Sequence, residues 1–333
     1  MKEETRYIFS NGELFQKDLS ICFKNEKGNF YIPVKDTKEL YCFNEITLST
    51  KLLGLLAKAG IVVHFFGYYE NYIGTYYPKD YLLSGRLTVK QALAYENNRL
   101  QIAKSIVLGI GSNIRSLLYH YYRHGKSELK PLLDWLRTDF PLQVQICKDI
   151  KQLLRTEGEV WARFYSTFEI ILPPDFVMSK RVKRPPDNPI NALISFGNTL
   201  LYTKTISQIY HTHLNQTISY LHEPAERRFS LSLDLSEVFK PAIVFKTIFD
   251  CVNNRKITVV KHFDKKLNYA LLNNSGRKVF IDEFENRINK TFEHKKLKRR
   301  TSYKQAIKID AYKLIKHIME GKEFIPFDME EKV

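Results

Sequence analysis

The chain has 333 residues, of which 44% are hydrophobic, a composition that excludes an intrinsically disordered protein and allows two domains. Lysine and arginine outnumber aspartate and glutamate by 52 to 36, and the formal net charge of +16 favours a polyanionic partner such as nucleic acid. The alternative is a surface that lysine keeps soluble.

The cysteines and the apolar stretches narrow the class of protein further. The four cysteines are scattered without a CxxC pair, which argues against a zinc knuckle or a disulfide framework and predicts reduced, buried thiols. The first residues, MKEETRYIFSNGEL, lack the apolar segment of a signal peptide, and no stretch approaches the roughly 18 apolar residues of a membrane span. We therefore expect a cytoplasmic protein with no membrane partner.

Short runs of β-branched and aromatic residues fill positions 7–77 and predict a β-rich domain. Turn signals separate these runs, among them Asn11-Gly12 and residues 26–29. One helix is expected between the strands, because Ser49 can cap a segment of helical apolar period that ends at Gly60.

Beyond a linker at residues 78–86, an apolar period of about 3.6 residues predicts helices to the end of the chain. The candidate helices cover residues 87–125, 141–169, 188–212, 236–249, 277–293 and 302–320. The sequence thus predicts an α+β protein, with a small N-terminal β-rich domain at residues 1–80 and a larger all-α domain at residues 87–333.

The predicted helix KDIKQLLRTEGEVWARFYSTF, residues 148–168, carries a carboxylate on its apolar stripe. Glu157 lies four residues from an apolar stripe position on either side, whereas Glu159 lies outside the stripe. A buried carboxylate must be paired with a base, protonated or bound to a cation, since leaving it unpaired costs about 3–5 kcal/mol. Pairing with an arginine, such as Arg163 or Arg115, is the alternative to a cation.

The segment SYLHEPAERRFSLSLDLSEVFKP, residues 219–241, combines a histidine with two carboxylates. On its own, His222 is typical of a structural histidine. Asp234 and Glu237 match a variant of the capping box at the start of an apolar helix, which is the alternative to a binding site. Their i,i+3 spacing also puts both carboxylates on one helix face, where a cation could lie between that face, His222 and Glu157.

Together, these segments resemble the Cas-one family of CRISPR-associated integrases and endonucleases, which insert spacers into CRISPR arrays. The resemblance spans the whole chain. Its most specific blocks are TEGEVWARFY, RPPDNPINALISFGNTLLY and SYLHEPAERRFSLSLDLSEVFKP, at residues 156–165, 184–202 and 219–241. They are similar to the family's EG-xx-AR-xY, P-xN-x-LL and LHE…SL-x-LDL-xE-x-F-[RK]-P motifs, in the same order.

The resemblance implies a catalytic group in which Glu157, His222 and Glu237 are ligands of a divalent metal and Asp234 is the acidic residue beside them. Oxygen ligands suit Mg²⁺, and one imidazole makes the site hospitable to Mn²⁺. The family fold is a β-rich domain, here expected to dimerise, joined to a helical catalytic domain. The expected partners are double-stranded DNA from the protospacer and the CRISPR repeat, a second copy of the chain, and a dimer of the small Cas-two subunit.

The chain departs from the family pattern at two positions. Asn198 stands where many members have tyrosine, and Lys240 replaces a frequent arginine. Both positions bear on how DNA is held near the metal. Glu237 is aspartate in many relatives, so its carboxylate reaches one methylene further.

In the activity that the resemblance implies, a 3′-hydroxyl of an incoming DNA fragment attacks a phosphodiester of the repeat, with help from the cation. Basic side chains should hold the DNA backbone rather than read its bases, although any such run can also be a solvated face. The candidates are Lys180, Arg181, Lys183 and Arg184 in the proline-bearing loop, Arg227 and Arg228 after the histidine, and the run at residues 294–300.

Two other classes of function use the same residues differently. A stand-alone metal-dependent nuclease acting on branched DNA repair intermediates would use water in place of the 3′-hydroxyl, and it would form no integration products with the partner and a repeat. A non-enzymatic nucleic-acid scaffold would be unaffected by chelation of the metal.

Overall fold

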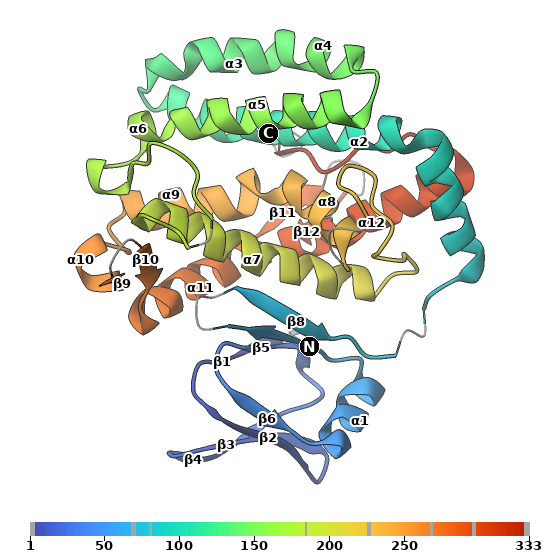
Figure 1. Cartoon of the computed structure of the whole chain (residues 1–333), viewed down its shortest axis with the longest axis vertical. Helices are drawn as coiled ribbons and strands as arrows, with labels where there is room; N and C mark the ends of the chain where they lie inside the picture. Colours follow the sequence, from blue (N-terminus) through green and yellow to red (C-terminus); the bar gives the residue numbers. More distant parts are fainter. Residues whose placement is uncertain are drawn as a thin grey trace. The chain divides into compact units, whose positions relative to one another are not determined.

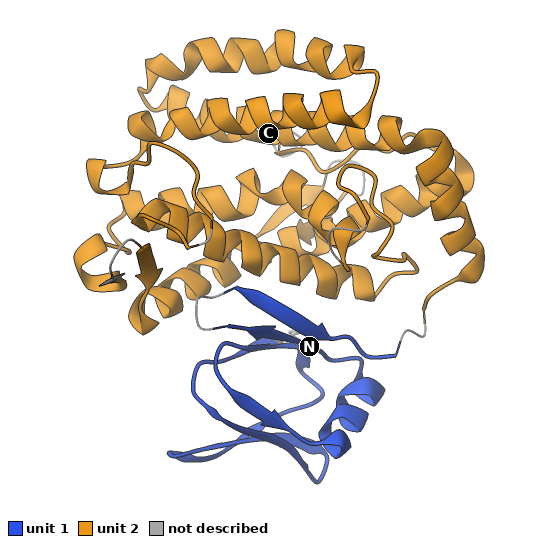
Figure 2. Cartoon of the chain, viewed as in Figure 1, with its two compact units in different colours: residues 1–81 blue, residues 82–333 orange. Residues whose placement is uncertain are grey.

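The computed structural model describes residues 4–67, 71–79, 82–183, 185–224, 228–266, 269–294 and 298–329. The chain divides into two compact units, Met1–Tyr81 and Leu82–Val333 (Figure 2). The first unit is β-rich and the second is mostly helical (Figure 1), which confirms the predicted fold class.

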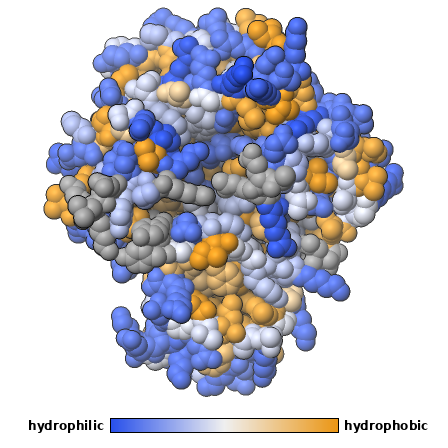
Figure 3. Space-filling view, in the orientation of Figure 1, coloured by the Kyte–Doolittle hydropathy of each residue, from blue (hydrophilic) through white to orange (hydrophobic). Residues whose placement is uncertain are grey.

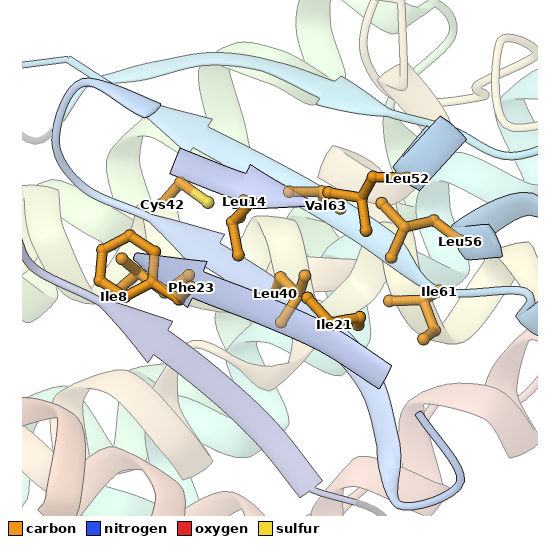
Figure 4. Close-up of a cluster of buried hydrophobic side chains, with 10 residues drawn as sticks. All are labelled: Ile8, Leu14, Ile21, Phe23, Leu40, Cys42, Leu52, Leu56, Ile61 and Val63. Carbon is orange, nitrogen blue, oxygen red and sulfur yellow. The ribbon is translucent and has the colours of Figure 1, made fainter. Parts of the chain in front are cut away.

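The first unit consists of two four-stranded sheets and one helix. One sheet has the order β1 (Glu4–Ile8), β5 (Thr37–Cys42), β7 (Val62–Phe66) and β8 (Tyr72–Tyr76). The other has the order β4 (Gly28–Ile32), β3 (Ser20–Asn25), β2 (Gly12–Lys17) and β6 (Ile46–Leu48). Apolar side chains from both sheets and from the helix meet in one core cluster (Figure 4), so that both sheets have a buried face.

The helix of the first unit, α1 (Thr50–Ala59), has the ends that the sequence predicts. The hydroxyl of Ser49 accepts a hydrogen bond from the amide of Leu52, which satisfies one of the free donors at a helix start. Gly60 ends the helix in the left-handed region, with φ 65°, where a residue without a side chain is favoured. The predicted helix is therefore confirmed at both ends.

Helices make up most of the second unit. They are α2 (Gly85–Arg123), α3 (Lys130–Arg137), α4 (Asp139–Ile146), α5 (Ile150–Ser166), α6 (Phe168–Ile171), α7 (Pro189–Tyr210), α8 (Ser230–Phe239), α9 (Lys246–Asn253), α10 (Val259–His262), α11 (Asn274–Asn289) and α12 (Tyr303–Glu320). A π-helical turn, Pro241–Phe245, joins α8 to α9.

Helix α7 is buried along nearly its whole length and packs against α8 and α12 in the middle of this unit (Figure 1). The apolar residues of α7 occur on all sides of the helix, a pattern typical of a helix inside a domain, and its buried polar residues include Lys204, which pairs with Glu285. The long helix α2 contacts both α5 and α8. The two helices that carry the predicted site residues are thus fixed to a common neighbour.

Two short antiparallel hairpins depart from the prediction of an all-α second domain. They are β9 (Phe263–Lys266) with β10 (Tyr269–Leu272), and β11 (Thr291–His294) with β12 (Arg299–Ser302). Their strands have four residues each, too few to show a period of two against the helical pattern around them. The helix expected at residues 277–293 consequently ends earlier, at Asn289.

The surface and the cysteines agree with the composition. Figure 3 shows a face on which hydrophilic side chains predominate and apolar ones are grouped in separate patches. Among the described residues, none of the helices combines the length and apolar character that crossing a membrane requires. All four cysteines are buried free thiols, as expected.

Candidate active site

Helix α5 presents Glu157 to the interior of the second unit. The helix starts where the carboxylate of Asp149 accepts a hydrogen bond from the amide of Gln152, at 2.8 Å. Its buried residues Leu153 and Trp161 lie one turn before and after Glu157, which is itself partly buried. The apolar stripe of the sequence analysis is therefore present, with the carboxylate on it.

The arginine Arg163 does not pair with Glu157. Its guanidinium lies 2.7 Å from the carboxylate of Glu159, on the exposed side of the same helix. The proposed pairing with Arg163 is thus wrong.

Asp234 lies on α8 with its carboxylate completely buried, and it binds the loop that carries the histidine. One oxygen, Oδ2, accepts hydrogen bonds from the amides of Tyr220 and Leu221, at 2.7 and 2.8 Å. The other, Oδ1, accepts from the amide of His222 at 3.0 Å and from its ring Nδ1 at 2.9 Å. Because Nδ1 donates to Asp234, the second ring nitrogen, Nε2, is left as the acceptor that could bind a metal.

These bonds rule out the capping-box interpretation of Asp234 and Glu237. Helix α8 begins at Ser230, so Asp234 lies in its second turn and not at its start. The expected helix at residues 236–249 is accordingly replaced by α8, the π-helical turn and α9. Asp234 holds the histidine loop, and no N-cap hydrogen bond of its side chain is found in the described structure.

Glu237 lies three residues along the same helix face and is 4% exposed. Its Oε1 forms an ion pair with the ammonium of Lys240, which also lies 5.6 Å from the centre of the Trp161 ring. Its Oε2 is buried and has no hydrogen-bond partner within the described part of the chain. A buried carboxylate oxygen without a partner is costly unless something else binds it.

The pKa values show that Glu157, Glu237 and His222 interact electrostatically. Burial, followed by the negative charge of Glu237, raises the pKa of Glu157 to about 7, although Lys240 and His222 act in the opposite direction. For His222, burial lowers the pKa, but the hydrogen bond and charge of Asp234, with the charges of Glu237 and Glu157, raise it above its ordinary value overall. The three residues that the sequence predicts as ligands therefore lie in one electrostatic cluster.

The side chains as they stand do not enclose an ion. Within the described ranges, no group of three His, Cys, Asp or Glu side chains is placed so that it could hold a metal. The ammonium of Lys240 lies beside the carboxylate of Glu237. The donor set nevertheless fits a divalent cation, because it offers two carboxylates and an imidazole nitrogen, and one carboxylate oxygen has no partner in the part of the chain that the structure describes.

The predicted DNA-binding residues separate into several groups. Arg181 points inward: its guanidinium donates to Oδ1 of Asn191 and to Oγ of Ser195, both at 2.9 Å. This arginine fixes the loop to α7 and has fewer donors left for a phosphate. Arg184 and Arg227 lie outside the described residues.

The remaining basic candidates lie at the surface. Lys180, Lys183 and Arg228 are exposed. Partial desolvation of its ammonium, followed by the charges of Lys240 and Arg181, lowers the pKa of Lys183, and the charges of Glu237 and Glu157 act on it in the opposite direction. Its ammonium therefore lies near the carboxylate cluster. In the run at residues 294–300, residues 295–297 lie outside the described part, His294 is buried and residues 298–300 are exposed.

Sequence reasoning missed two contributors. Lys240 was noted only as a departure from the family pattern, and its i,i+3 spacing from Glu237 was the signal for the ion pair. Burial raises the pKa of Tyr165 well above its ordinary range. The charge of Arg181 lowers this pKa, and the charges of Glu237 and Glu157 raise it further. This tyrosine belongs to the TEGEVWARFY block, but nothing in its spacing indicated a role.

Comparison with known proteins identifies the family. The family model of the CRISPR-associated protein Cas1 matches residues 6–286. The chain belongs to the Cas1 family. It is 43% identical to a Cas1 protein of Methanobrevibacter ruminantium, over 98% of this chain and 99% of that protein. It is 41% identical to a protein of Thermodesulfovibrio yellowstonii named as a CRISPR-associated endonuclease Cas1, over 98% of each.

Solved structures agree with this Cas1 assignment. The Cas1 protein of Thermotoga maritima has a TM-score of 0.87 and 36% identity, over 96% of this chain and 98% of that one. A casposase bound to integration product has a TM-score of 0.85 at 20% identity, over 99% of this chain and 94% of that one. A Cas6-RT-Cas1–Cas2 complex also has a TM-score of 0.85, at 18% identity, over 98% of this chain and 36% of the matching chain. The last two show the shared fold.

Proposed function

We propose that this protein is a DNA endonuclease and integrase of CRISPR adaptation, which joins a 3′-hydroxyl of a short DNA fragment to a phosphodiester of the repeat with the help of Mg²⁺ or Mn²⁺. The names of its relatives and the integration product bound to a casposase of the same fold support this activity. The observation that carries the metal dependence is the buried oxygen of Glu237 that has no hydrogen-bond partner among the described residues and lies in one cluster with Glu157 and His222.

Glu157, Glu237 and the Nε2 of His222 would hold the cation. When bound, a divalent cation lowers the pKa of the attacking hydroxyl and neutralises charge at the phosphate. Asp234 orients the imidazole by accepting from its Nδ1–H and so selects the neutral tautomer with its lone pair on Nε2, as outer-shell carboxylates do for histidine ligands. Lys240 balances the charge of Glu237 and lies beside the cluster, where it can also neutralise a DNA phosphate.

The DNA would be held mainly through its backbone. The net charge of +16 supplies the attraction, and Lys180, Lys183 and Arg228 are the exposed candidates, of which Lys183 lies near the proposed metal ligands. Structures of related folds include a Cas1–DNA complex and complexes with Cas2. We infer that double-stranded DNA, a Cas2 subunit and a second copy of this chain, through the β-rich unit, are the partners.

A strand-transfer assay tests the proposed function directly. The protein is mixed with a Cas2 partner, a labelled fragment with free 3′-hydroxyls and a plasmid with the repeat, in Mn²⁺ or in EDTA. We expect labelled plasmid in Mn²⁺ and none in EDTA, and no product from fragments with blocked 3′ ends. Cleavage without any transfer would favour the stand-alone nuclease, and activity that persists in EDTA would contradict the metal-dependent mechanism.

The proposed DNA path predicts how salt affects binding. Replacing Lys180 and Lys183 together by alanine should flatten the plot of log affinity against log salt by about 1–2 units, because each lysine on a phosphate releases a counterion. The control replaces Lys130 and Lys151, two exposed lysines elsewhere in this unit, and should leave the slope unchanged. Fluorescence anisotropy with a duplex at several salt concentrations measures both. Equal slopes in the wild type and the Lys180/Lys183 variant would place the DNA elsewhere.

A further inference from the structure

The segment after α12 packs back onto the helix that carries Glu237. We call residues 322–329 the C-terminal strap. The chain turns at Gly321, with φ 68°, and continues without helix or strand to Phe327. Phe324 and Phe327 of the strap are buried, and the Phe327 ring stacks on the ring of Phe239, with centroids 4.7 Å apart and an interplanar angle of 15°. Phe239 is the last residue of α8, two positions after Glu237.

Asn113 ties the strap to α8 and α2. This asparagine lies on α2, is completely buried and has three hydrogen bonds. Its amide nitrogen donates to the carbonyls of Val238 and Phe327, each at 2.9 Å, and its oxygen accepts from the amide of Met329 at 2.7 Å. One side chain thus connects the residue next to Glu237 with two positions of the strap.

Other contacts hold the strap independently of Asn113. The amide of Phe327 donates to Oδ2 of Asp310 on α12, at 2.6 Å, and Ser112 donates to the carboxylate of Asp328 at 2.9 Å. The strap is therefore anchored to α12 and to α2, and it can transmit their positions to the end of α8.

The end of α8 needs such support. Pro241 has no amide hydrogen, so it cannot give the helical bond to the carbonyl of Glu237, which accepts instead from the amide of Lys240 at 3.3 Å. The chain then continues as a π-helical turn, which is an unusual continuation of an α-helix. Asn113 supplies a donor to the Val238 carbonyl at this point.

We propose that the C-terminal strap and Asn113 are positioning elements of the metal site, which fix the end of α8 so that the Glu237 carboxylate faces Glu157 and His222. This inference rests on the proposed metal site. The strap contacts no atom of Glu237 in the bonds above. It acts through the backbone of Val238 and the ring of Phe239, so its loss should displace the ligand without removing it.

The test measures Mn²⁺ affinity by electron paramagnetic resonance, together with melting in EDTA. Asn113→Ala and a deletion of residues 322–333 should each weaken Mn²⁺ binding about tenfold or more, the size of effect that outer-shell partners have on metal affinity. Excess Mn²⁺ should then restore strand transfer. Two controls should bind Mn²⁺ like the wild type: Asn97→Ala, whose amide donates to the carbonyl of Leu93 on the same helix, and a deletion of residues 330–333 alone.

The outcomes separate the strap from the metal site itself. Where Asn113→Ala or the deletion of residues 322–333 fails to fold, the milder Phe327→Leu takes its place. This change keeps an apolar side chain but loses the stacking on Phe239, and it should still weaken Mn²⁺ binding several-fold below its melting temperature. Folded strap variants with wild-type Mn²⁺ affinity would overturn this inference while leaving the proposed function intact. A wild type that binds no Mn²⁺ would overturn both.

Discussion

Replacing Glu157 by glutamine is expected to abolish strand transfer and cleavage and to leave folding and DNA binding intact. Glutamine keeps the size of the side chain but removes the negative charge. A loss of activity would therefore show that the charge of Glu157 is needed, as expected of a ligand to a cation. We expect activity to fall by at least about 100-fold, as when an electrostatic stabiliser is removed from an active site. Labelled-fragment transfer and duplex binding, measured on the same preparation, give both values.

The matched control for this change is Glu159→Gln, two residues along the same helix. Glu159 lies 40% exposed in an ion pair with Arg163, and its loss should leave activity within about twofold, as surface ion pairs contribute little. Glu157→Gln with wild-type transfer in Mg²⁺ would remove Glu157 from the site. Inactivity of both variants would point to a structural role of α5 instead.

The raised pKa of Glu157 also fixes the direction of the pH dependence. Its pKa in the folded, metal-free protein is about 7, above the ordinary 4.5, so ionisation weakens the fold as pH rises from about 4.5 through 7. Without metal, Glu157→Gln should therefore be more stable than the wild type above about pH 7, by on the order of 1–2 kcal/mol. Mn²⁺ affinity of the wild type should increase over the same range, because metal and proton compete for this carboxylate.

The second large effect is expected for Asp234→Ala, and it concerns stability as well as metal binding. The change removes a buried carboxylate that accepts four hydrogen bonds, three of them from backbone amides. We expect a loss of about 3–5 kcal/mol of unfolding free energy, seen as a melting temperature lower by roughly 10 °C in EDTA. Mn²⁺ affinity should fall as well, because His222 loses the partner that orients it.

Asp134→Ala serves as the control for Asp234→Ala. Asp134 is 62% exposed and pairs with an equally exposed Lys130, so its loss should change the melting temperature by only about 1–2 °C. Calorimetry in EDTA compares the two variants. An Asp234→Ala protein that melts like the wild type would mean that the four hydrogen bonds do not hold the histidine loop.

Much of this protein could be predicted from local sequence. Ser49 and Gly60 carry the chemistry of a helix start and a helix end, and the structure has both there. Glu157 could be recognised as unusual because a single carboxylate breaks an apolar stripe of period 3.6. Such signals depend on a few neighbouring residues, which is why they survive in the folded chain.

Other features depend on residues far apart in the sequence. The capping box at Asp234 and Glu237 was misleading because α8 starts earlier, where the amide of Leu231 donates to the carbonyl of Gln216 and no side chain caps the helix. Arg181 looked like a DNA contact because the loop is basic, but its bonds to Asn191 make it part of the interior. No local sequence pattern indicates where α8 starts or where Arg181 points, because hydrogen bonds between residues far apart in the sequence determine both.

The central claim is that Glu157, His222 and Glu237 together hold the cation that the reaction uses. Titration with Mn²⁺, followed by electron paramagnetic resonance at about pH 8, tests it in the wild type and in Glu157→Gln, His222→Ala and Glu237→Gln. We expect saturable binding to the wild type and at least about tenfold weaker binding to each folded variant, with strand transfer lost in parallel. A wild type that binds no Mn²⁺, or three variants that bind it as tightly as the wild type, would contradict the claim.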